Sequence, residues 1–372
     1  ILLYYKFMIK TLAIETSCDD TSLAIVSYEN GFFENPILRT YSQITEHQQF
    51  GGVVPEIAYR LHEEKILDLI REIGYNQIAE CDFITVTKTP WLPGSLVVGN
   101  TVASMLGLFF NKPVYRVNHI YGHIFSLLLD RNVDQVPLPW TILTASGGHN
   151  ELYTIEWSFA QAGIEIRRIG HSLDDAAGES FDKVARMLGG SYPGGPWISQ
   201  MAAGFNPQKD SENFIPSKFS LSNGEKQLFK RILLDGKWTN TKQDQIETNT
   251  HNFSFSGMKS QVYQLLQKYP LETLTTEDIQ EICREFQECV SDILMIKTLR
   301  AAELSTAQTI GLVGGVSAND RLFEKVSSHS SSDTLQSLRP IKKEYSTDNA
   351  AMIWVIWILQ SLQFIKNTDF LA

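Results

Sequence analysis

The sequence predicts an α/β protein made of two similar lobes with a cleft between them. A β-rich run, a polar turn and a second β-rich run occur twice, over residues 11–28 and 140–155. Each set predicts a β-hairpin with a small, polar tip. Strand-like runs then alternate with helix-like patterns, which is typical of α/β architecture. A hairpin repeated at the head of each half predicts two lobes of the same design.

The composition narrows the functional classes. The chain has 372 residues, which favours two or three domains, and its 43% hydrophobic and 20% charged residues are typical of a globular enzyme. A net charge of −10 argues against broad, non-specific binding of nucleic acid, although it leaves room for a local basic patch. The four cysteines form no CxxC pair, which fits a reducing compartment without a disulfide framework.

The first lobe is expected over residues 8–134. Residues 1–7, ILLYYKF, precede Met8 and are expected to be a non-native leader. Apolar periodicity predicts the secondary structure of this lobe. The predicted strands are 11–15, 23–28, 83–87 and 113–117, and the predicted helices are 56–73, 99–110 and 119–129.

The second lobe is expected over residues 135–345 and begins with the hairpin strands 140–145 and 152–155. A helix from Ala177 ends at a double glycine and leads into a Pro-Gly-Gly-Pro turn at 193–196. The polar stretch 205–250 predicts an insertion with little core of its own. Helices at 260–268 and 277–304, a strand at 309–313 and a glycine turn at 314–319 follow.

The apolar run 350–365 lies near the C-terminus. It is interrupted by Gln360, Ser361 and Gln363 and is shorter than a bilayer requires. The pattern therefore predicts a terminal helix, within residues 346–365, that packs on the first lobe, and no membrane contact is expected.

Two histidines one helical turn apart form a candidate metal site. His119 and His123 lie on one helix face, at the spacing that lets both imidazoles reach one ion. A carboxylate must complete such a site, and Asp348 is the candidate. Asp348 could instead cap the terminal helix, a role open also to Ser346 and Asn349. The spacing matches the HExxH metalloprotease helix, but Ile120 stands where that mechanism needs its glutamate.

Three small, polar segments could bind a phosphate or a nucleotide. The hairpin tips 16–21 and 146–150 offer hydroxyls and backbone N–H groups, although such turns also occur without a ligand. The helix near 177–188 carries charges opposite its apolar stripe, and a solvated face is the alternative explanation. The turn 314–319 follows a strand but is not the GxGxxG dinucleotide motif. Cys18 has no evident base beside it and is expected to be structural.

Nine segments resemble, in order, the bacterial-type tRNA adenosine threonylcarbamoyltransferase family (TsaD). They span about 340 residues of the chain. The segments are IETSCDDTS (14–22), GGVVPEIAYRLH (51–62), LPGSLVVGNT (92–101), VNHIYGHI (117–124), SGGHNEL (146–152), LDDAAGESFDKVARMLGGSYPGGP (173–196), FSFSGMK (253–259), GGVSAN (314–319) and STDNAAMI (346–353).

The resemblance implies a two-lobed actin-like ATPase-superfamily (ASKHA) fold in a cytoplasmic enzyme. The implied reaction moves a threonylcarbamoyl group from threonylcarbamoyl-AMP to N6 of adenosine 37 in tRNAs that read codons starting with A. It also implies one divalent metal per subunit, iron or zinc, with ATP or ADP as a further ligand of the cleft. The implied partners are tRNA, an inactive paralogue of similar fold (TsaB-like) and a small P-loop ATPase (TsaE-like).

The resemblance also assigns residues, by matching positions of the family's motifs. The implied metal ligands are His119, His123 and Asp348, and Asp19 matches an acidic residue associated with activity. The positions implied to hold the adenylate are Thr144, Ala145, Ser146, Gly147, Gly148, Asp182, Gly195 and Asn319.

Two tryptophans depart from the family pattern. Trp91 stands where the family has the second glycine of Gly-Pro-Gly-Leu, and Trp357 stands where a small residue is expected. One hypothesis is that a codon read as glycine in the source was translated as tryptophan. If Trp91 is genuine, a non-catalytic scaffold like the inactive paralogue stays open, although the intact metal ligands disfavour it. Two further alternatives are weaker. A metal-dependent glycoprotein endopeptidase would need the glutamate that this sequence lacks, and a sugar kinase would be inferred from the fold alone.

Overall fold

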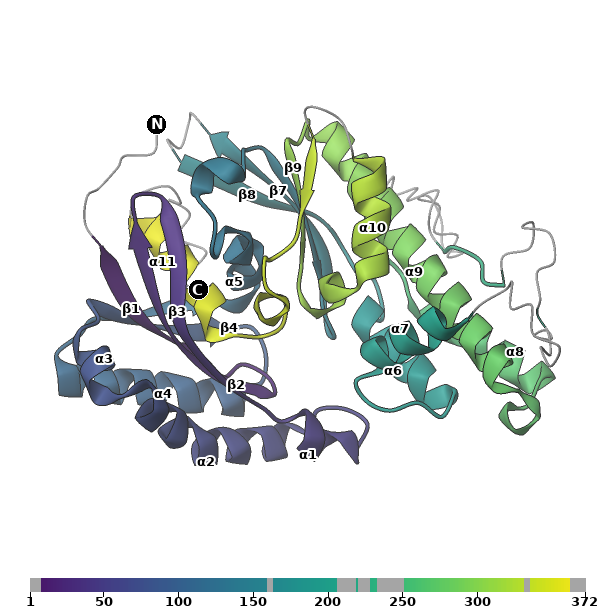
Figure 1. Cartoon of the computed structure of the whole chain (residues 1–372), viewed down its shortest axis with the longest axis horizontal. Coiled ribbons are helices and arrows are strands. Elements are labelled where there is room, and N and C mark those ends of the chain that lie inside the picture. Colours follow the sequence, from purple (N-terminus) through teal and green to yellow (C-terminus); the bar gives the residue numbers. More distant parts are fainter. Residues whose placement is uncertain are drawn as a thin grey trace, which may run out of the picture.

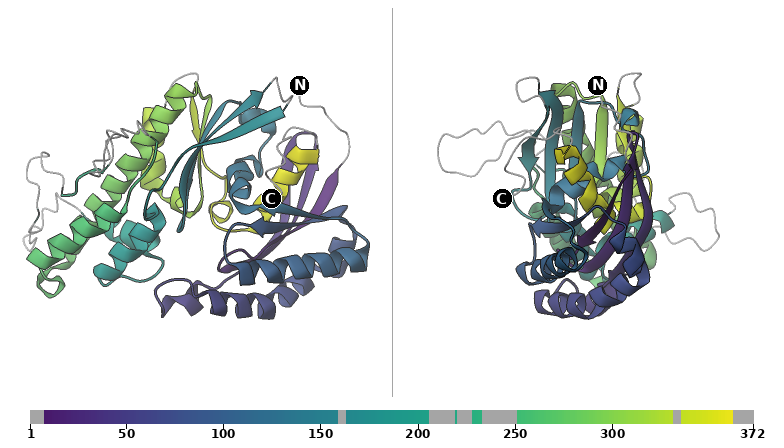
Figure 2. Two further views of the ribbon diagram at one scale, coloured as in Figure 1. Left: turned by 180° about the vertical axis from the view of Figure 1, so that it is seen from behind. Right: turned by 90° about the vertical axis from the view of Figure 1, so that its left-hand side faces the viewer.

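The structure, a computed structural model, describes residues 8–158, 163–205, 219, 228–232, 251–330 and 335–361. The leader expected at residues 1–7 and most of the insertion expected at 205–250 lie outside the described residues. The described chain forms two β-sheets with helices between and around them (Figures 1 and 2).

The first sheet has five strands in the order β3-β2-β1-β4-β5. The strands β1 and β2 form the predicted hairpin, β3 pairs with β2 in antiparallel fashion, and β4 and β5 continue parallel to β1. The bounds are β1 (Ile9–Glu15), β2 (Asp20–Glu29), β3 (Phe32–Ser42), β4 (Phe83–Thr89) and β5 (Val114–Asn118).

The second sheet repeats this design strand for strand, in the order β8-β7-β6-β9-β10. Here β6 and β7 form the hairpin, β8 pairs with β7, and β9 and β10 run parallel to β6. The bounds are β6 (Trp140–Ala145), β7 (Asn150–Ser158), β8 (Gly163–His171), β9 (Thr309–Val313) and β10 (Gln336–Leu338). The predicted duplication is confirmed and includes a third strand in each lobe that the sequence analysis missed.

Two helices lie between the sheets and carry the residues of greatest interest. They are α5 (His119–Phe125) and α11 (Ala350–Ser361), seen between the two sheets in Figure 1. Their buried side chains, such as Ile124 and Trp354, share one core with Val26 of β2 and Ile142 of β6. The helix predicted at 119–129 is shorter, because the chain continues after Phe125 as a 3-10 turn.

The remaining helices of the first lobe cover the outer face of the first sheet. Alternation along β1 explains this: Leu12 and Ile14 face these helices, whereas Ala13 faces α5 and α11. The helices are α1 (Ile44–Gln48), α2 (Pro55–Ile73), α3 (Tyr75–Ala79) and α4 (Pro93–Phe110). The helix predicted at 99–110 begins six residues earlier, at Pro93, because proline suits the first helical position.

The outer face of the second sheet is covered in the same way. Leu143 and Leu312 from the strands meet Phe181 and Phe286 from the helices. The helices are α6 (Ala177–Met187), α7 (Gly194–Gly204), α8 (Ser256–Lys268), α9 (Thr276–Leu304) and α10 (Asp320–His329). The segment 193–196 is not a separate turn as expected, because its glycines already form the first turn of α7.

By length and composition alone, α4 is apolar enough to cross a membrane, which the sequence analysis did not notice. One side of α4, including Val98 and Ala103, packs on the first sheet. The other side exposes Val97, Met105, Leu108 and Phe109. The apolar character of α4 therefore divides between a core face and an uncovered face.

Candidate metal centre and interlobe cavity

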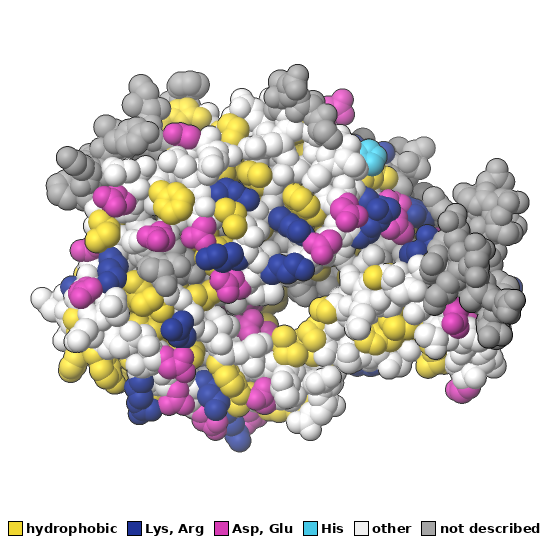
Figure 3. Space-filling view, viewed as in Figure 1, with side chains coloured by type: hydrophobic (Ala, Val, Ile, Leu, Met, Phe, Trp, Pro, Cys, Tyr) yellow, Lys and Arg dark blue, Asp and Glu magenta, His cyan; other side chains and the backbone are white. Residues whose placement is uncertain are grey.

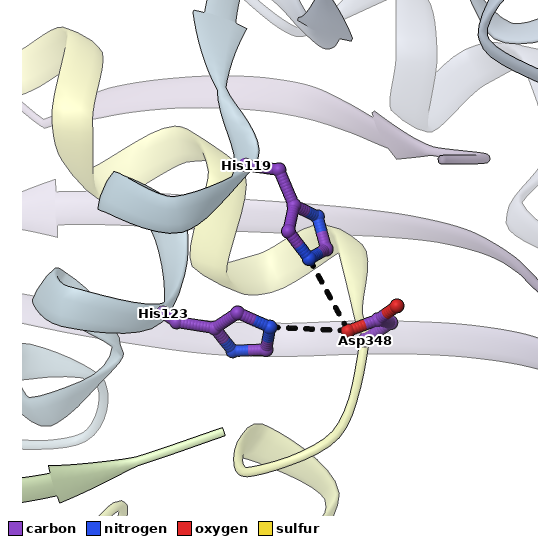
Figure 4. A group of neighbouring side chains, drawn as sticks. All are labelled: His119, His123 and Asp348. Atoms are coloured by element: carbon purple, nitrogen blue, oxygen red, sulfur yellow. Dashed lines mark hydrogen bonds and ion pairs between the residues drawn. The ribbon is translucent and has the colours of Figure 1, made fainter. Parts of the chain in front are cut away.

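His119, His123 and Asp348 converge between the two sheets. Both histidines extend from α5 toward the carboxylate that precedes α11 (Figure 4). Nε2 of His123 lies 3.0 Å from Oδ1 of Asp348, and Nε2 of His119 lies 3.4 Å from the same oxygen. The three side chains present ligand atoms within 4.8 Å of one another. Two imidazole nitrogens and one carboxylate oxygen form a three-ligand set that leaves coordination positions open.

The carboxylate of Asp348 is not needed to cap α11. The side-chain oxygen of Asn349 accepts a hydrogen bond from the N–H of Met352 at 3.1 Å, which is the capping contact. A second N–H of the first turn, that of Ala350, donates to the hydroxyl of Ser22 at 3.0 Å. Asp348 is therefore left to face the two histidines.

A third carboxylate, Glu15, orients His119 from behind. Glu15 ends β1, is fully buried, and its Oε2 lies 3.0 Å from Nδ1 of His119. The hydroxyl of Thr87 and the N–H of Ser17 donate to the two oxygens of Glu15, each at 2.5 Å. A carboxylate on one ring nitrogen directs the other nitrogen toward the ligand position. Sequence reasoning missed Glu15, although a carboxylate closing an apolar strand is a usable signal.

The electrostatics of this cluster favour a positive charge at its centre. Burial opposes a charge on His119, but the carboxylates of Asp348 and Glu15 outweigh it and raise the pKa of His119 to about 10. Burial also opposes a charge on Asp348, yet His119 and His123 hold the pKa of Asp348 well below its usual range. Burial lowers the pKa of His123, which leaves a neutral imidazole. A divalent cation suits this donor set, and iron and zinc fit it equally well.

The predicted adenylate loop lies at the tip of the second hairpin. Thr144 and Ala145 end β6, and the tip docks on α6, because the N–H groups of Gly178 and Glu179 donate to the carbonyls of Ser146 and Gly147 at 3.2 and 3.0 Å. A Cβ at Gly147 would meet no heavy atom within 4 Å. Backbone that faces open space in this way can approach a ligand closely.

Asp182, Gly195 and Asn319 also belong to the second lobe. Burial raises the pKa of Asp182, whose Oδ1 accepts the N–H of Gly194 at 2.7 Å and so holds the start of α7. Gly195 likewise faces open space. The Nδ2 group of Asn319 donates to Ser199 and Gln287, both at 3.0 Å, and its Oδ1 caps α10. Ser199 and Gln287 therefore fix Asn319, and sequence reasoning found neither.

Asp19 lies at the tip of the first hairpin. Burial and the negative charge of Asp348 raise the pKa of Asp19, so the metal cluster and this tip influence each other. Burial and Asp19 raise the pKa of the Cys18 thiol well above its usual value. Cys18 is therefore a protonated thiol at neutral pH, in agreement with its expected structural role.

Trp91 fills the space between the metal cluster and the adenylate loop. Its ring meets His149 edge-on at 4.5 Å between centroids and His119 at 6.1 Å, and a Cβ at Gly148 would overlap it. Its backbone φ of +112° lies in a region that favours glycine. Its buried indole N–H has no acceptor among the described residues. The side chain of Trp357 lies outside the described residues.

A cavity of about 390 Å³ lies where the two lobes meet. It is lined by residues 48–51 of the first lobe and by Asp182, Arg186 and residues 190–192 of the second. The Arg186 guanidinium donates to the carbonyl of Gly51 and so links the lobes. Figure 3 shows the molecule hollowed between the lobes. The charges of α6 divide between the cavity and solvent: Asp182 and Arg186 line the cavity, whereas Lys183, 33% exposed, pairs with Asp175 and Glu179 at 2.9 and 2.8 Å.

The protease alternative finds no support in this geometry. Ile120, which replaces the glutamate of HExxH, is 8% exposed and packs in the core shared by the two lobes. No carboxylate occupies the position of a metalloprotease base on α5.

Comparison with known proteins identifies similar sequences over nearly the whole chain. The family model described as tRNA N6-adenosine threonylcarbamoyltransferase matches residues 37–355. A protein of that name from Thermosipho africanus (strain TCF52B) is 38% identical over 345 residues, which cover 92% of this chain and 91% of the relative. Another from Persephonella marina (strain DSM 14350 / EX-H1) is 36% identical over 349 residues, covering 92% and 88%.

Solved structures with a similar fold are more distant in sequence. HypF from T. kodakarensis superposes with a TM-score of 0.56 at 11% identity, covering 100% of this chain and 50% of that chain. A phosphate- and nucleotide-bound form of HypF gives 0.51 at 10% identity, covering 97% and 47%. This chain thus spans about half of each. The likeness confirms the expected two-lobed actin-like ATPase fold and carries no statement about activity.

Proposed function

The chain belongs to the tRNA N6-adenosine threonylcarbamoyltransferase family and is an acyltransferase that modifies tRNA, and we propose the following reaction for it. The enzyme transfers the threonylcarbamoyl group from threonylcarbamoyl-AMP to N6 of adenosine 37, in tRNAs that read codons starting with A. The observation that supports this most is the convergence of His119, His123 and Asp348 between the lobes. Adenosine 37 lies in a single-stranded loop, where its base is accessible without opening a duplex.

The reaction needs alignment more than activation. The donor is already a mixed anhydride, so the amine at N6 forms a C–N bond with the carbamoyl carbon while the C–O bond to AMP breaks. A metal held by His119, His123 and Asp348 would supply a Lewis acid for oxygen atoms of the donor. Glu15 holds His119 in the orientation that this requires.

Residues of the two hairpin tips, together with Gly195, bind the adenylate and accept the proton. In the second lobe, the backbone of Ser146, Gly147, Gly148 and Gly195 binds the adenylate phosphate and ribose, between β6 and α7. In the first lobe, Asp19 accepts the proton that N6 loses, because a carboxylate with a raised pKa is a better base than an ordinary one. ATP or ADP would occupy the same adenylate positions as competitors.

The partners that we propose are tRNA, a TsaB-like inactive paralogue and a TsaE-like P-loop ATPase, in the cytoplasm. The paralogue has a place to bind on the exposed side of α4, where Met105, Leu108 and Phe109 are 63, 85 and 79% exposed. An apolar stripe of this kind on a helix marks an interaction surface more often than a solvated one. It lies on the outer face of the first lobe, away from the cavity, so binding there leaves the cleft open. We also propose that the first lobe ends at residue 134 and that the second lobe begins at residue 135.

The alternative is a scaffold without catalytic activity, and Trp91 is the observation in its favour. The indole occupies the space between His119 and His149 that a bound donor would cross. The complete ligand set argues against a scaffold, because a scaffold has no use for a buried metal site.

A transfer assay tests the proposal. The protein is combined with both partners, synthetic threonylcarbamoyl-AMP and unmodified tRNA, and the modified nucleoside is read by mass spectrometry. The variant with His119→Ala and His123→Ala is expected to form no product, whereas His329→Ala, on the exposed end of α10, is expected to retain the full rate. Equal product from the double variant would refute metal-assisted transfer, and no product from any form, with partners assembled, would favour the scaffold.

A further inference from the structure

A buried network of polar side chains lies beneath the first hairpin tip, and the proposed mechanism does not use it. It contains Thr21 from β2, Gln43 and His47 around α1, and His62 from α2, all with 0% exposure. Such side chains cost free energy in a core unless their hydrogen bonds are satisfied. The direction of each bond follows from the backbone groups at the two ends of the network.

The tautomer of His62 is fixed by a carbonyl. Nε2 of His62 lies 3.0 Å from the carbonyl oxygen of Cys18, which can only accept, so Nε2 carries a proton. Nδ1 of the neutral ring is then an acceptor, and it receives the hydroxyl of Thr21 at 2.7 Å. Burial lowers the pKa of His62, which agrees with a neutral ring.

The tautomer of His47 is fixed by an N–H at the opposite end. The N–H of Val54 donates to Nδ1 of His47 at 3.3 Å, so the proton of this ring lies on Nε2 and is donated to Oε1 of Gln43 at 3.1 Å. The amide nitrogen of Gln43 is thereby directed at the carbonyl of Ala58 and at Nδ1 of His62, both at 3.4 Å. The network is therefore a continuous series of hydrogen bonds in which the donor and the acceptor of each bond are determined.

This hydrogen-bonded network holds the backbone in place on both sides of Asp19. His62 holds the carbonyl of Cys18, and the N–H of Gln43 holds the carbonyl of Asp19 at 3.0 Å. Two fixed carbonyls in succession fix the two peptide planes that flank the Cα of Asp19 and thus the direction in which its side chain leaves the turn. We propose that His62, together with His47 and Gln43, is a positioning residue of the transferase site that aims the Asp19 carboxylate at the reacting amine.

This inference rests on the proposed role of Asp19. His62 is fully buried and does not reach the cavity, so it acts only through the turn. If the turn shifts, the carboxylate of Asp19 moves away from the position in which it can accept the proton. Losses of about 100-fold in rate accompany displacements of about 1 Å.

The test compares His62→Leu and His62→Gln in the complete complex. His62→Leu removes the hydrogen bonds to Cys18, Thr21 and Gln43, and we expect kcat to fall by about 10- to 100-fold with KM for tRNA unchanged. Gln retains an N–H donor for the carbonyl of Cys18, and His62→Gln should recover most of the rate. The matched control is Ile70→Ala, two turns further along α2 and 3% exposed, which weakens the same lobe without touching the network.

A double-variant comparison separates positioning from general stability. If His62 acts through Asp19, Asp19→Asn combined with His62→Leu loses no more rate than Asp19→Asn alone. Multiplied losses, or a loss in Ile70→Ala equal to that in His62→Leu at similar melting temperature and metal content, would overturn the inference. The proposed function fails differently, when the wild-type protein in the complete complex forms no product, whereas full activity of Asp19→Asn would overturn the role of Asp19 on which this inference rests.

Discussion

At the scale of single residues, the proposed metal ligands could be predicted from the sequence, whereas the carboxylate that orients His119 could not. Spacing on one helix predicts His119 and His123, and Asp348 was found as the missing carboxylate. Glu15 lies 104 positions from His119 and is brought to it only by the pairing of β1 with β4 and of β4 with β5. A carboxylate at the end of an apolar strand marks Glu15 as a candidate, but a local sequence pattern does not show that Glu15 reaches His119.

The contact between Glu15 and His119 predicts a graded loss of metal affinity. Glu15→Ala removes the hydrogen bond and the charge and is expected to weaken metal binding by about 100-fold, and Glu15→Gln, which keeps a hydrogen-bond acceptor, by about tenfold. Competition with a chromophoric chelator measures both. Glu29→Gln, at the exposed end of β2, is the control. Unchanged affinity in Glu15→Ala would show that His119 needs no orienting carboxylate.

Trp91 is the residue at which the sequence and the geometry conflict. A positive φ costs a residue with a side chain about 1–2 kcal/mol, and a buried N–H without an acceptor costs about 1–3 kcal/mol. Both observations support the hypothesis of glycine codons translated as tryptophan.

We therefore predict that Trp91→Gly opens the site. The affinity for a non-hydrolysable donor analogue, measured by calorimetry, is expected to rise by at least about tenfold, because the indole no longer lies against Gly148. Trp157→Ala, in the partly exposed part of β7, is the control and should change nothing. Mass spectrometry of the natural protein is expected to read glycine at positions 91 and 357. Tryptophan at both would contradict the codon hypothesis.

At the scale of secondary structure elements, the hairpins, the long helices and the edge strand β5 could be predicted, whereas the edge strands β3, β8 and β10 could not. Thr309 to Val313 matches β9 in full because the run is apolar and bounded by turns. The strand β3 contains Pro36, and β8 contains Arg167 and Arg168 on the exposed part of the sheet edge. Proline and charges weaken the strand pattern, yet both are tolerated at an edge, where only one side needs hydrogen bonds.

The exposed face of α4 is where we expect the proposed TsaB-like paralogue to bind. Met105→Glu with Leu108→Glu places two charges on that face, and we expect the affinity for the paralogue to fall by about 100-fold or more. The reason is that two apolar side chains that become buried on binding contribute about 3 kcal/mol or more. The melting temperature should not change, because neither side chain is in the core. Leu304→Glu, exposed at the end of α9, is the control. Undiminished binding would place the interface elsewhere.

At the scale of the whole molecule, duplication explains how the site is built. Each lobe supplies one hairpin tip, and the strand order is the same in both sheets, so the two tips come to lie at corresponding places facing the cleft. The proposed metal ligands lie on α5 and directly before α11, and both helices belong to the core that the two lobes share. The sequence repeat predicted the two lobes, but which helices lie between the sheets is decided by long-range packing.

We propose that this site performs acyl transfer with the help of one bound metal ion. The most direct measurement strips the wild-type protein with a chelator, adds back iron or zinc in steps in the presence of both partners, and follows formation of the modified adenosine by mass spectrometry. The rate is expected to rise from zero and to level off at one metal ion per chain, and the variant with His119→Ala and His123→Ala is expected to stay inactive throughout. A full rate before any metal is added would contradict this proposal.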